Sequence, residues 1–98
     1  MIEKFEFQTK EELAKDILET LNDFCGEKDI DLEGKISKSE ELEEDLGLDS
    51  LDKVELAIHI ENRYGILIQD SHLTNLITVD DLIREVTKCV SEKHGLWV

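Results

Sequence analysis

The sequence predicts an all-α fold, a four-helix bundle with three longer helices and one short helix. The chain has 98 residues, enough for one small domain with a single modest core. Hydrophobic residues make up 40%, charged residues 37% and aromatic residues only 5%, which is typical of short amphipathic helices around a Leu, Ile and Val core. We expect one domain over 1–98, with its core at about 9–91, a short N-terminal lead and a tail at 92–98.

The first helix is expected to begin at Thr9, since Glu12 three residues later completes a capping-box pattern. Apolar residues then recur at helical spacing up to Gly26: Leu13, Ile17, Leu18, Leu21 and Phe24. From Glu27 to Glu44 this period is lost. We expect a long ordered loop there, held by four apolar residues: Ile30, Leu32, Ile36 and Leu42.

The second helix is expected to open near Asp49 or Ser50 and to stop at Gly65. A brief third helix, capped by Asp70 or Ser71, should run through Leu73 and Leu76. A last helix should start at Thr78 or Asp80. Its apolar residues are Leu82, Ile83, Val86 and Val90.

The formal net charge of −14 makes nucleic acid and anionic lipid poor partners and favours basic patches on other proteins. The longest apolar runs, such as Ile66–Ile68, are far too short to span a membrane, and no signal or transit peptide is recognisable. We expect a cytoplasmic monomer in which Cys25 and Cys89 are free structural thiols.

Motifs for catalysis or metal binding are not found in the sequence. There is no Cys/His metal spacing, Gly-rich phosphate loop or nucleophile elbow. The three histidines, His59, His72 and His94, are scattered, and we expect structural surface roles for them. The sequence therefore predicts neither an enzyme nor a metal site.

Chemistry is expected at Ser50, the predicted start of the second helix. A serine there exposes its hydroxyl beside unpaired backbone N–H groups, where a phosphodiester anion is favoured. The alternative is that Ser50 only caps the helix. On a helical wheel the apolar residues behind it cover about 220°, wider than one core stripe needs, so Leu51 and Ile58 should lie at an exposed edge among carboxylates.

The segment Glu44–Leu56, EDLGLDSLDKVEL, closely resembles the signature of acyl carrier proteins. The resemblance extends from about Thr9 to Ser91. It includes the apolar residue eight positions before the serine, Leu42, and the stretch Glu61–Gly65 that closes the second helix. It also includes the start of the last helix at Thr78–Leu82.

This resemblance implies an acyl-carrier-like four-helix bundle with Ser50, flanked by Asp49 and Leu51, as the covalent attachment site for 4′-phosphopantetheine from coenzyme A. A phosphopantetheinyl transferase would load the arm, and enzymes such as ketosynthases and acyltransferases would process the acyl thioesters in fatty acid or related lipid or polyketide synthesis. The implied partner face is Asp49, Leu51, Asp52, Val54, Glu55, Ile58 and Glu61.

Three other functions fit parts of the pattern. Residues 29–40 place Asp29, Asp31, Glu33, Gly34 and Glu40 on positions of an EF-hand calcium loop, although position 5 is Glu and no second loop is found. A helical adaptor could bind partners through the acidic second helix without any arm. Peptidyl or D-alanyl carriers share the serine-bearing helix, but the charge of −14 favours an acyl carrier.

Overall fold

Four helices make up the regular structure of the computed structural model, which describes residues 9–27 and 36–95. They are α1 Lys10–Glu27, α2 Ser50–Tyr64, α3 Asp70–Leu73 and α4 Val79–His94. In the described residues the one β-type pairing is an isolated antiparallel bridge between Glu41 and Thr78. The prediction of an all-α bundle with three longer helices and one short helix is confirmed.

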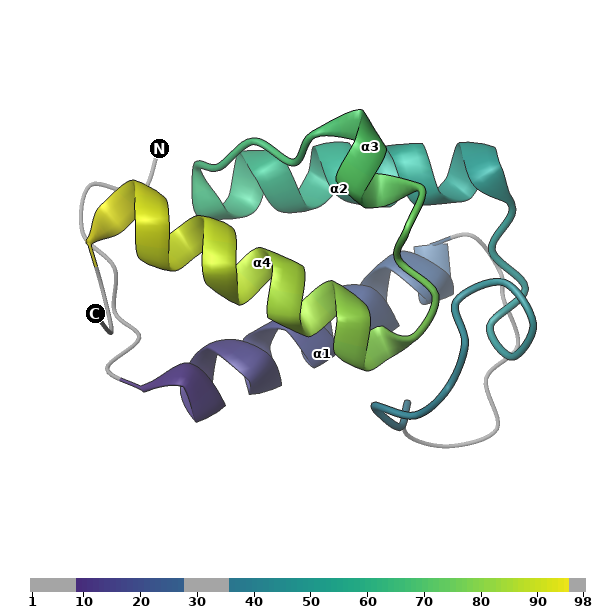
Figure 1. Cartoon of the computed structure of the whole chain (residues 1–98). Coiled ribbons are helices and arrows are strands. Elements are labelled where there is room, and N and C mark those ends of the chain that lie inside the picture. Colours follow the sequence, from purple (N-terminus) through teal and green to yellow (C-terminus); the bar gives the residue numbers. More distant parts are fainter. Residues whose placement is uncertain (1–8, 28–35, 96–98) are drawn as a thin grey trace.

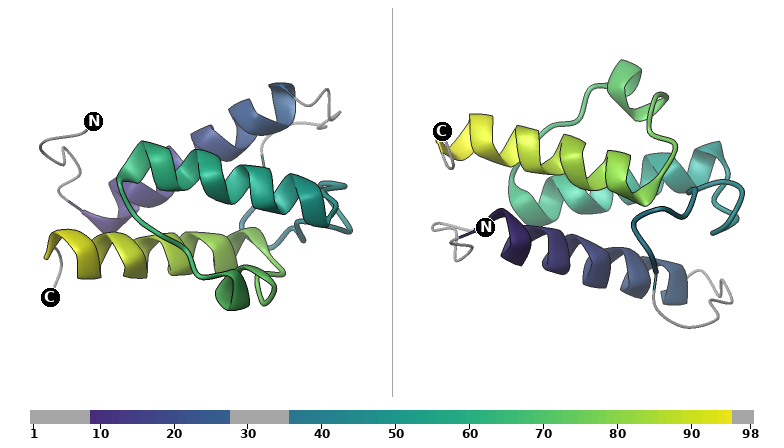
Figure 2. Two further views of the ribbon diagram at one scale, coloured as in Figure 1. Left: turned by 90° about the horizontal axis from the view of Figure 1, so that it is seen from above. Right: turned by 60° about the horizontal axis from the view of Figure 1, so that its bottom comes forward.

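The three longer helices pack around one core, and α1 runs antiparallel to α2 and α4 (Figures 1 and 2). Aliphatic side chains from all three helices are fully or almost fully buried in this core. They include Leu13, Ile17, Leu21, Leu56, Ile60, Leu82, Val86 and Val90. The apolar period read from the sequence therefore marks the inner face of each long helix.

The long helices begin where side-chain caps are available. Thr9 Oγ1 accepts a hydrogen bond from Glu12 N at 3.1 Å. Asp49 and Thr78 each form a complete capping box, with Asp52 and Asp81 as the reciprocal residues. Gly65 and Gly95 end α2 and α4 with φ angles of 65° and 66°, which glycine adopts at little cost.

The short helix differs from its prediction. Gln69 is its N-cap and gives no side-chain hydrogen bond, so neither Asp70 nor Ser71 caps it. It ends at Leu73, and Leu76 is buried in the turn that follows. A four-residue helix gains little from capping, and the burial of Leu73 and Leu76 holds this segment instead.

The C-terminal boundary of the bundle also differs. Residues 92–94, which the sequence assigned to a tail, belong to α4. The ring Nε2 of His94 lies 3.1 Å from Tyr64 O at the end of α2, and the Gly95 N–H bonds to Ser91 O. Residues 96–98, with Trp97, lie outside the described residues.

The loop before α2 is hydrogen-bonded to the segment at the start of α4. Leu42 N donates to Ile77 O at 2.8 Å, and Val79 N donates to Glu40 O at 2.9 Å. Leu42 is buried, as predicted, and Ile36 packs against the core. The other two predicted loop anchors, Ile30 and Leu32, lie outside the described residues.

Candidate functional site

Ser50 is the first residue of α2 and is exposed. The helix is capped by Asp49, whose Oδ1 accepts from Asp52 N at 2.8 Å, while Asp52 Oδ2 accepts from Asp49 N at 3.1 Å. The alternative in which Ser50 is the cap is therefore wrong. Within the described part of the chain, the Ser50 hydroxyl makes no hydrogen bond and is available for chemistry.

Two backbone donors remain open beside that hydroxyl. The N–H groups of Ser50 and Leu51 have no acceptor among the described residues. At the start of α4, by contrast, the equivalent N–H groups of Val79 and Asp80 donate to Glu40 O and Lys38 O, both at 2.9 Å. The start of α2 is therefore a helix N-terminus with both an exposed hydroxyl and two open donors, which suits a phosphate diester.

Lys53 anchors the turn that carries Ser50. It is the one charged side chain among the buried described residues. Its Nζ donates to Leu76 O at 2.9 Å and pairs with Glu43 Oε2 at 3.2 Å. This role was not predicted, although the sequence holds one signal for it: Lys53 falls between Leu56 and Ala57 on the buried arc of the helical wheel.

The predicted partner face lies on the exposed side of α2. Leu51, Val54 and Ile58 have exposed fractions of 65%, 44% and 51%, so three apolar side chains that were expected at the surface are there. Asp49 is exposed, whereas Asp52, Glu55 and Glu61 are half-buried. This combination of apolar side chains and carboxylates gives α2 the features of a docking surface for a basic partner.

Two of the predicted acidic residues also have internal roles. Asp52 completes the capping box, and Glu61 Oε2 accepts a hydrogen bond from Ile68 N at 2.7 Å in the α2–α3 connection. Only an external role was predicted for these two residues. Two further exposed apolar side chains were not predicted at all: Leu67 at 83% and Ile77 at 58%.

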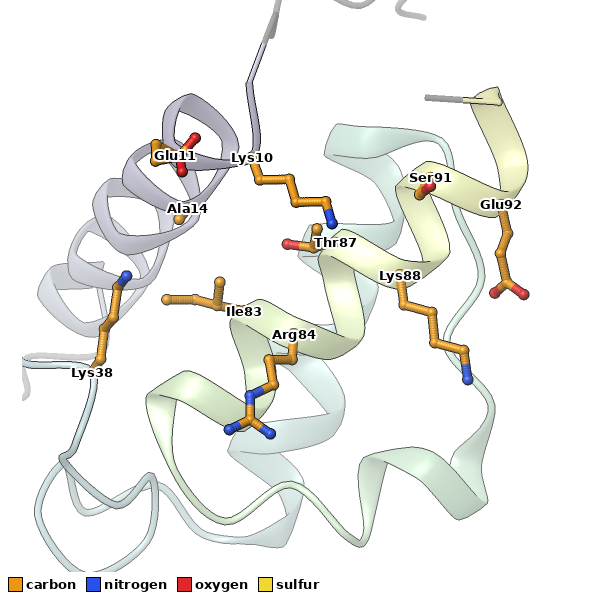
Figure 3. A pocket seen from close by; sticks show the side chains of 10 residues that line it. All are labelled: Lys10, Glu11, Ala14, Lys38, Ile83, Arg84, Thr87, Lys88, Ser91 and Glu92. Atoms are coloured by element: carbon orange, nitrogen blue, oxygen red, sulfur yellow. The ribbon is translucent and has the colours of Figure 1, made fainter. Parts of the chain in front are cut away.

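A shallow groove between α1 and α4 lies apart from this site. Its volume is about 520 Å³, and its lining comes from α1, α4 and the loop residue Lys38, with no residue of α2. Figure 3 shows the side chains of Lys10, Lys38, Arg84 and Lys88 around it. None of the predicted site residues lines this groove, so it is separate from the chemistry expected at Ser50.

The predicted surface histidines have separate environments. His59 is exposed, and His72 Nδ1 pairs with Glu85 Oε2 at 2.9 Å. In the residues that the structure describes, no group of three or more His, Cys, Asp or Glu side chains could hold a metal ion. Most of the loop at 29–40 that fits an EF-hand pattern lies outside those residues.

Both cysteines are free thiols, as predicted. Burial, with the nearby charge of Asp52, raises the pKa of Cys25 to about 11. Burial, with the hydrogen bond to Glu85, raises the pKa of Cys89 to about 11 as well. Because the thiolate is the reactive form, neither cysteine is a good nucleophile near neutral pH.

We therefore predict that both thiols react slowly with iodoacetamide at pH 8 in the native protein and at least about tenfold faster after unfolding in urea. The measurement is the time course of mass increase with and without urea. Fast labelling of the native chain would show that these thiols are not shielded as the structure indicates.

The comparison with protein families shows to which family the chain belongs. Residues 11–86 match the family model described as "Phosphopantetheine attachment site". The chain is also 32% identical over 75 residues to an acyl carrier protein of Exiguobacterium sibiricum, an alignment that covers 76% of this chain and 90% of the relative. The chain belongs to the acyl carrier protein family. Proteins of this family are carriers and are not themselves catalytic.

Other members of the acyl carrier protein family agree with this placement. The meromycolate extension acyl carrier protein of Mycobacterium tuberculosis is 32% identical over 84 residues, covering 86% of this chain and 70% of the relative. The crystal structure of an acyl carrier protein from Thermotoga maritima matches with a TM-score of 0.69 and 26% sequence identity. That match covers 91% of this chain and 99% of the other.

The prosthetic group of this family is a covalently attached 4′-phosphopantetheine. The residues at the start of α2 fit such a group, since an exposed hydroxyl lies beside the two open N–H donors of Ser50 and Leu51. The predicted cofactor is thereby confirmed at the level of the family. Among the described residues, no helix combines the length and the hydrophobicity that a membrane span requires.

Proposed function

We propose that Ser50 is the attachment residue and that this chain carries acyl groups as thioesters for enzymes of fatty acid, related lipid or polyketide synthesis. The observation that carries this proposal is the start of α2. There, a serine hydroxyl that is not used for capping is exposed next to two open backbone donors. The family supports the same conclusion, since its members carry a phosphopantetheine arm.

Loading requires a phosphopantetheinyl transferase. In this step Ser50 Oγ bonds to the phosphorus next to the pantetheine of coenzyme A, the pyrophosphate bond breaks, and adenosine 3′,5′-bisphosphate leaves. The hydroxyl proton passes to a base of the transferase, which also binds the divalent metal. Asp49 and Asp52 fix the helix start through their capping box, so the hydroxyl is presented on a rigid turn.

The arm supplies a terminal thiol that holds the acyl group as an activated thioester. The chain itself contributes presentation: it exposes the attachment point and offers α2 to basic docking patches on the transferase, ketosynthases and acyltransferases. Exposed Leu51, Val54 and Ile58 supply apolar contact, and the carboxylates around them supply steering. Free Cys25 and Cys89 suit a reducing compartment, so we propose a cytoplasmic location.

The direct test is incubation with coenzyme A, magnesium and a phosphopantetheinyl transferase, followed by mass spectrometry of the intact chain and of its peptides. We expect one arm per chain, on the peptide that contains Ser50. An arm on a different residue would refute Ser50 as the site. Absence of any gain with several transferases would instead favour an adaptor without a covalent arm.

Reversing one charge on α2 should slow docking. Asp52 is unsuitable for this test because it holds the capping box, so Glu55→Lys is the better variant. We expect its association rate with the transferase to fall about threefold or more at low ionic strength, with a weaker dependence on salt. Stopped-flow binding at several salt concentrations measures both effects.

The matched control is Glu19→Lys, which makes the same charge change at an exposed position of α1. It alters the net charge equally but lies outside the proposed partner face. Equal slowing by the two variants would show that only the overall charge matters. It would also remove the support for α2 as the docking surface.

A further inference from the structure

Ile77 is an exposed apolar residue on a backbone that is held firmly from several sides. Its own N–H donates to Asp81 Oδ2 at 3.1 Å, and its carbonyl accepts from Leu42 N at 2.8 Å. The preceding carbonyl, that of Leu76, accepts from Lys53 Nζ at 2.9 Å. The side chain nevertheless remains 58% exposed. The α3–α4 connection thus presents an isoleucine at a fixed position on the surface.

Lys53 links the α3–α4 connection to α2 by a hydrogen bond. A buried ammonium group is costly to desolvate, so its hydrogen bonds to Leu76 O and Glu43 must be kept for it to remain inside. Lys53 also closes the first turn of α2, since its N–H donates to Asp49 O at 3.0 Å. The α3–α4 connection is therefore attached to the same helical turn that carries Ser50.

Ser50 lies on the side of α2 that faces the segment leading to α3. At about 100° per residue, Ser50, Val54 and Glu61 fall within about 40° of one another on the helix. Glu61 accepts a hydrogen bond from Ile68 N, which shows that this side of α2 faces the segment leading to α3. The start of α2, the loop before it and the α3–α4 connection lie at one end of the bundle (Figures 1 and 2).

We propose that Ile77 is a further partner-contact residue beside Ser50, and that Lys53 is the positioning residue that holds it there. The occupant of this surface is an enzyme that acts at Ser50 and offers an apolar socket with a basic rim. Carboxylates adjoin this connection: Asp81 accepts a hydrogen bond from the Ile77 N–H, and Asp80 beside it pairs with Arg84 at 2.9 Å. Glu43 pairs with Lys53, which holds the carbonyl of Leu76. The assignment rests on the proposed function of Ser50.

The test compares two exposed apolar residues in the loading reaction. Ile77→Ser removes the proposed contact, whereas Leu67→Ser changes a side chain that is even more exposed, at 83%, but lies beyond the opposite end of α2. With a transferase specific for acyl carriers, we expect Ile77→Ser to raise KM about fivefold or more, as truncating an interface anchor does, with kcat within about twofold. Leu67→Ser should change neither constant more than about twofold.

Lys53→Met then tests the positioning role, because methionine keeps the apolar stem but loses the ammonium. We expect a rise in KM similar to that of Ile77→Ser. The double variant should be no worse than Ile77→Ser alone, since a loosened connection no longer presents the isoleucine. Additive effects would overturn the role of Lys53. The comparison of Ile77→Ser with Leu67→Ser remains decisive for Ile77 even where Lys53→Met melts early.

The outcomes separate this inference from the proposed function. Normal loading of the wild-type chain at Ser50, with equal KM for Ile77→Ser and Leu67→Ser, would overturn the assignment of Ile77 alone. Loading at a residue other than Ser50 would overturn the proposed function and this docking surface with it. A selective rise in KM for Ile77→Ser, with unchanged thermal melting, would support both.

Discussion

Ser50→Ala is expected to abolish loading completely while leaving the fold intact. The hydroxyl oxygen is the proposed acceptor, and alanine offers no other nucleophile at that position. Because Asp49 caps α2 and the Ser50 hydroxyl makes no hydrogen bond in the described part of the chain, the free energy of unfolding should change by less than about 0.5 kcal/mol. Intact mass after treatment with coenzyme A and transferase, together with thermal melting, measures both results.

The control variant is Ser71→Ala, which removes another exposed serine in the first turn of a helix, in this case α3. It should gain the arm at the wild-type rate. If Ser50→Ala still gains an arm, the attachment site is elsewhere. If Ser50→Ala fails to load, circular dichroism of the variant shows whether it is folded. Failure to load by a folded variant is assigned to the missing hydroxyl, and failure by an unfolded variant is assigned to loss of the fold.

Local signals in the sequence were sufficient to predict the long helices and the position of Ser50. Thr9 with Glu12, and glycine at 65, are short-range features whose effect does not depend on the rest of the fold. The exposed edge with Leu51 and Ile58 was predicted from the width of the apolar arc of the helix. That arc is wider than the stripe that one core-facing side can bury. The family resemblance then gave this local pattern its functional meaning.

What could not be predicted depends on contacts between distant segments. The choice between Asp49 and Ser50 as cap depends on backbone geometry that both residues could have adopted. The burial of Lys53 depends on Leu76 O, 23 residues away, being placed to accept a hydrogen bond from its ammonium group. The position of Ile77 depends on the same contact, so neither residue could be assigned to the site from sequence alone.

A second large effect is expected at the other end of α2, where Asp16→Ala should destabilise the bundle. Asp16 accepts two hydrogen bonds from Arg63, from Nε and a terminal nitrogen, both at 3.0 Å. It accepts a third from the hydroxyl of buried Tyr64 at 2.5 Å. This cluster joins α1 to the last turn of α2. It brings Asp16 into contact with Arg63 and Tyr64, which follow it by 47 and 48 positions in the sequence.

The charged state of Asp16 is favoured in the folded protein. Burial alone would raise its pKa, but the hydrogen bonds from Arg63 and Tyr64, with the positive charge of Arg63, outweigh burial and hold the pKa below its ordinary value. Burial and the same carboxylate raise the pKa of Tyr64 to about 12, so the phenol remains a donor at neutral pH. Asp16 on α1 is therefore an anion that is bound by donors at the end of α2.

We expect Asp16→Ala to lower the free energy of unfolding by about 2–4 kcal/mol, because it removes charge-assisted hydrogen bonds and takes the carboxylate acceptor from Tyr64. For a domain of this size the melting temperature should fall by about 10 °C or more. Asp23→Ala is the matched control, since it removes the same charge from an exposed position on α1. Both variants relieve self-repulsion equally, so the difference between them measures the cluster.

The pH dependence of that difference tests the cause. A carboxyl whose folded pKa lies below its unfolded value contributes stability that is complete above the unfolded value, near pH 4, and is lost as the pH falls through the folded pKa. The difference in melting temperature between the wild type and Asp16→Ala should therefore stay constant from about pH 7 to about pH 5 and shrink at more acid pH. A difference that persists undiminished at low pH would mean that Asp16 stabilises the bundle through packing, since a protonated carboxyl can no longer act as the anion that Arg63 and Tyr64 bind.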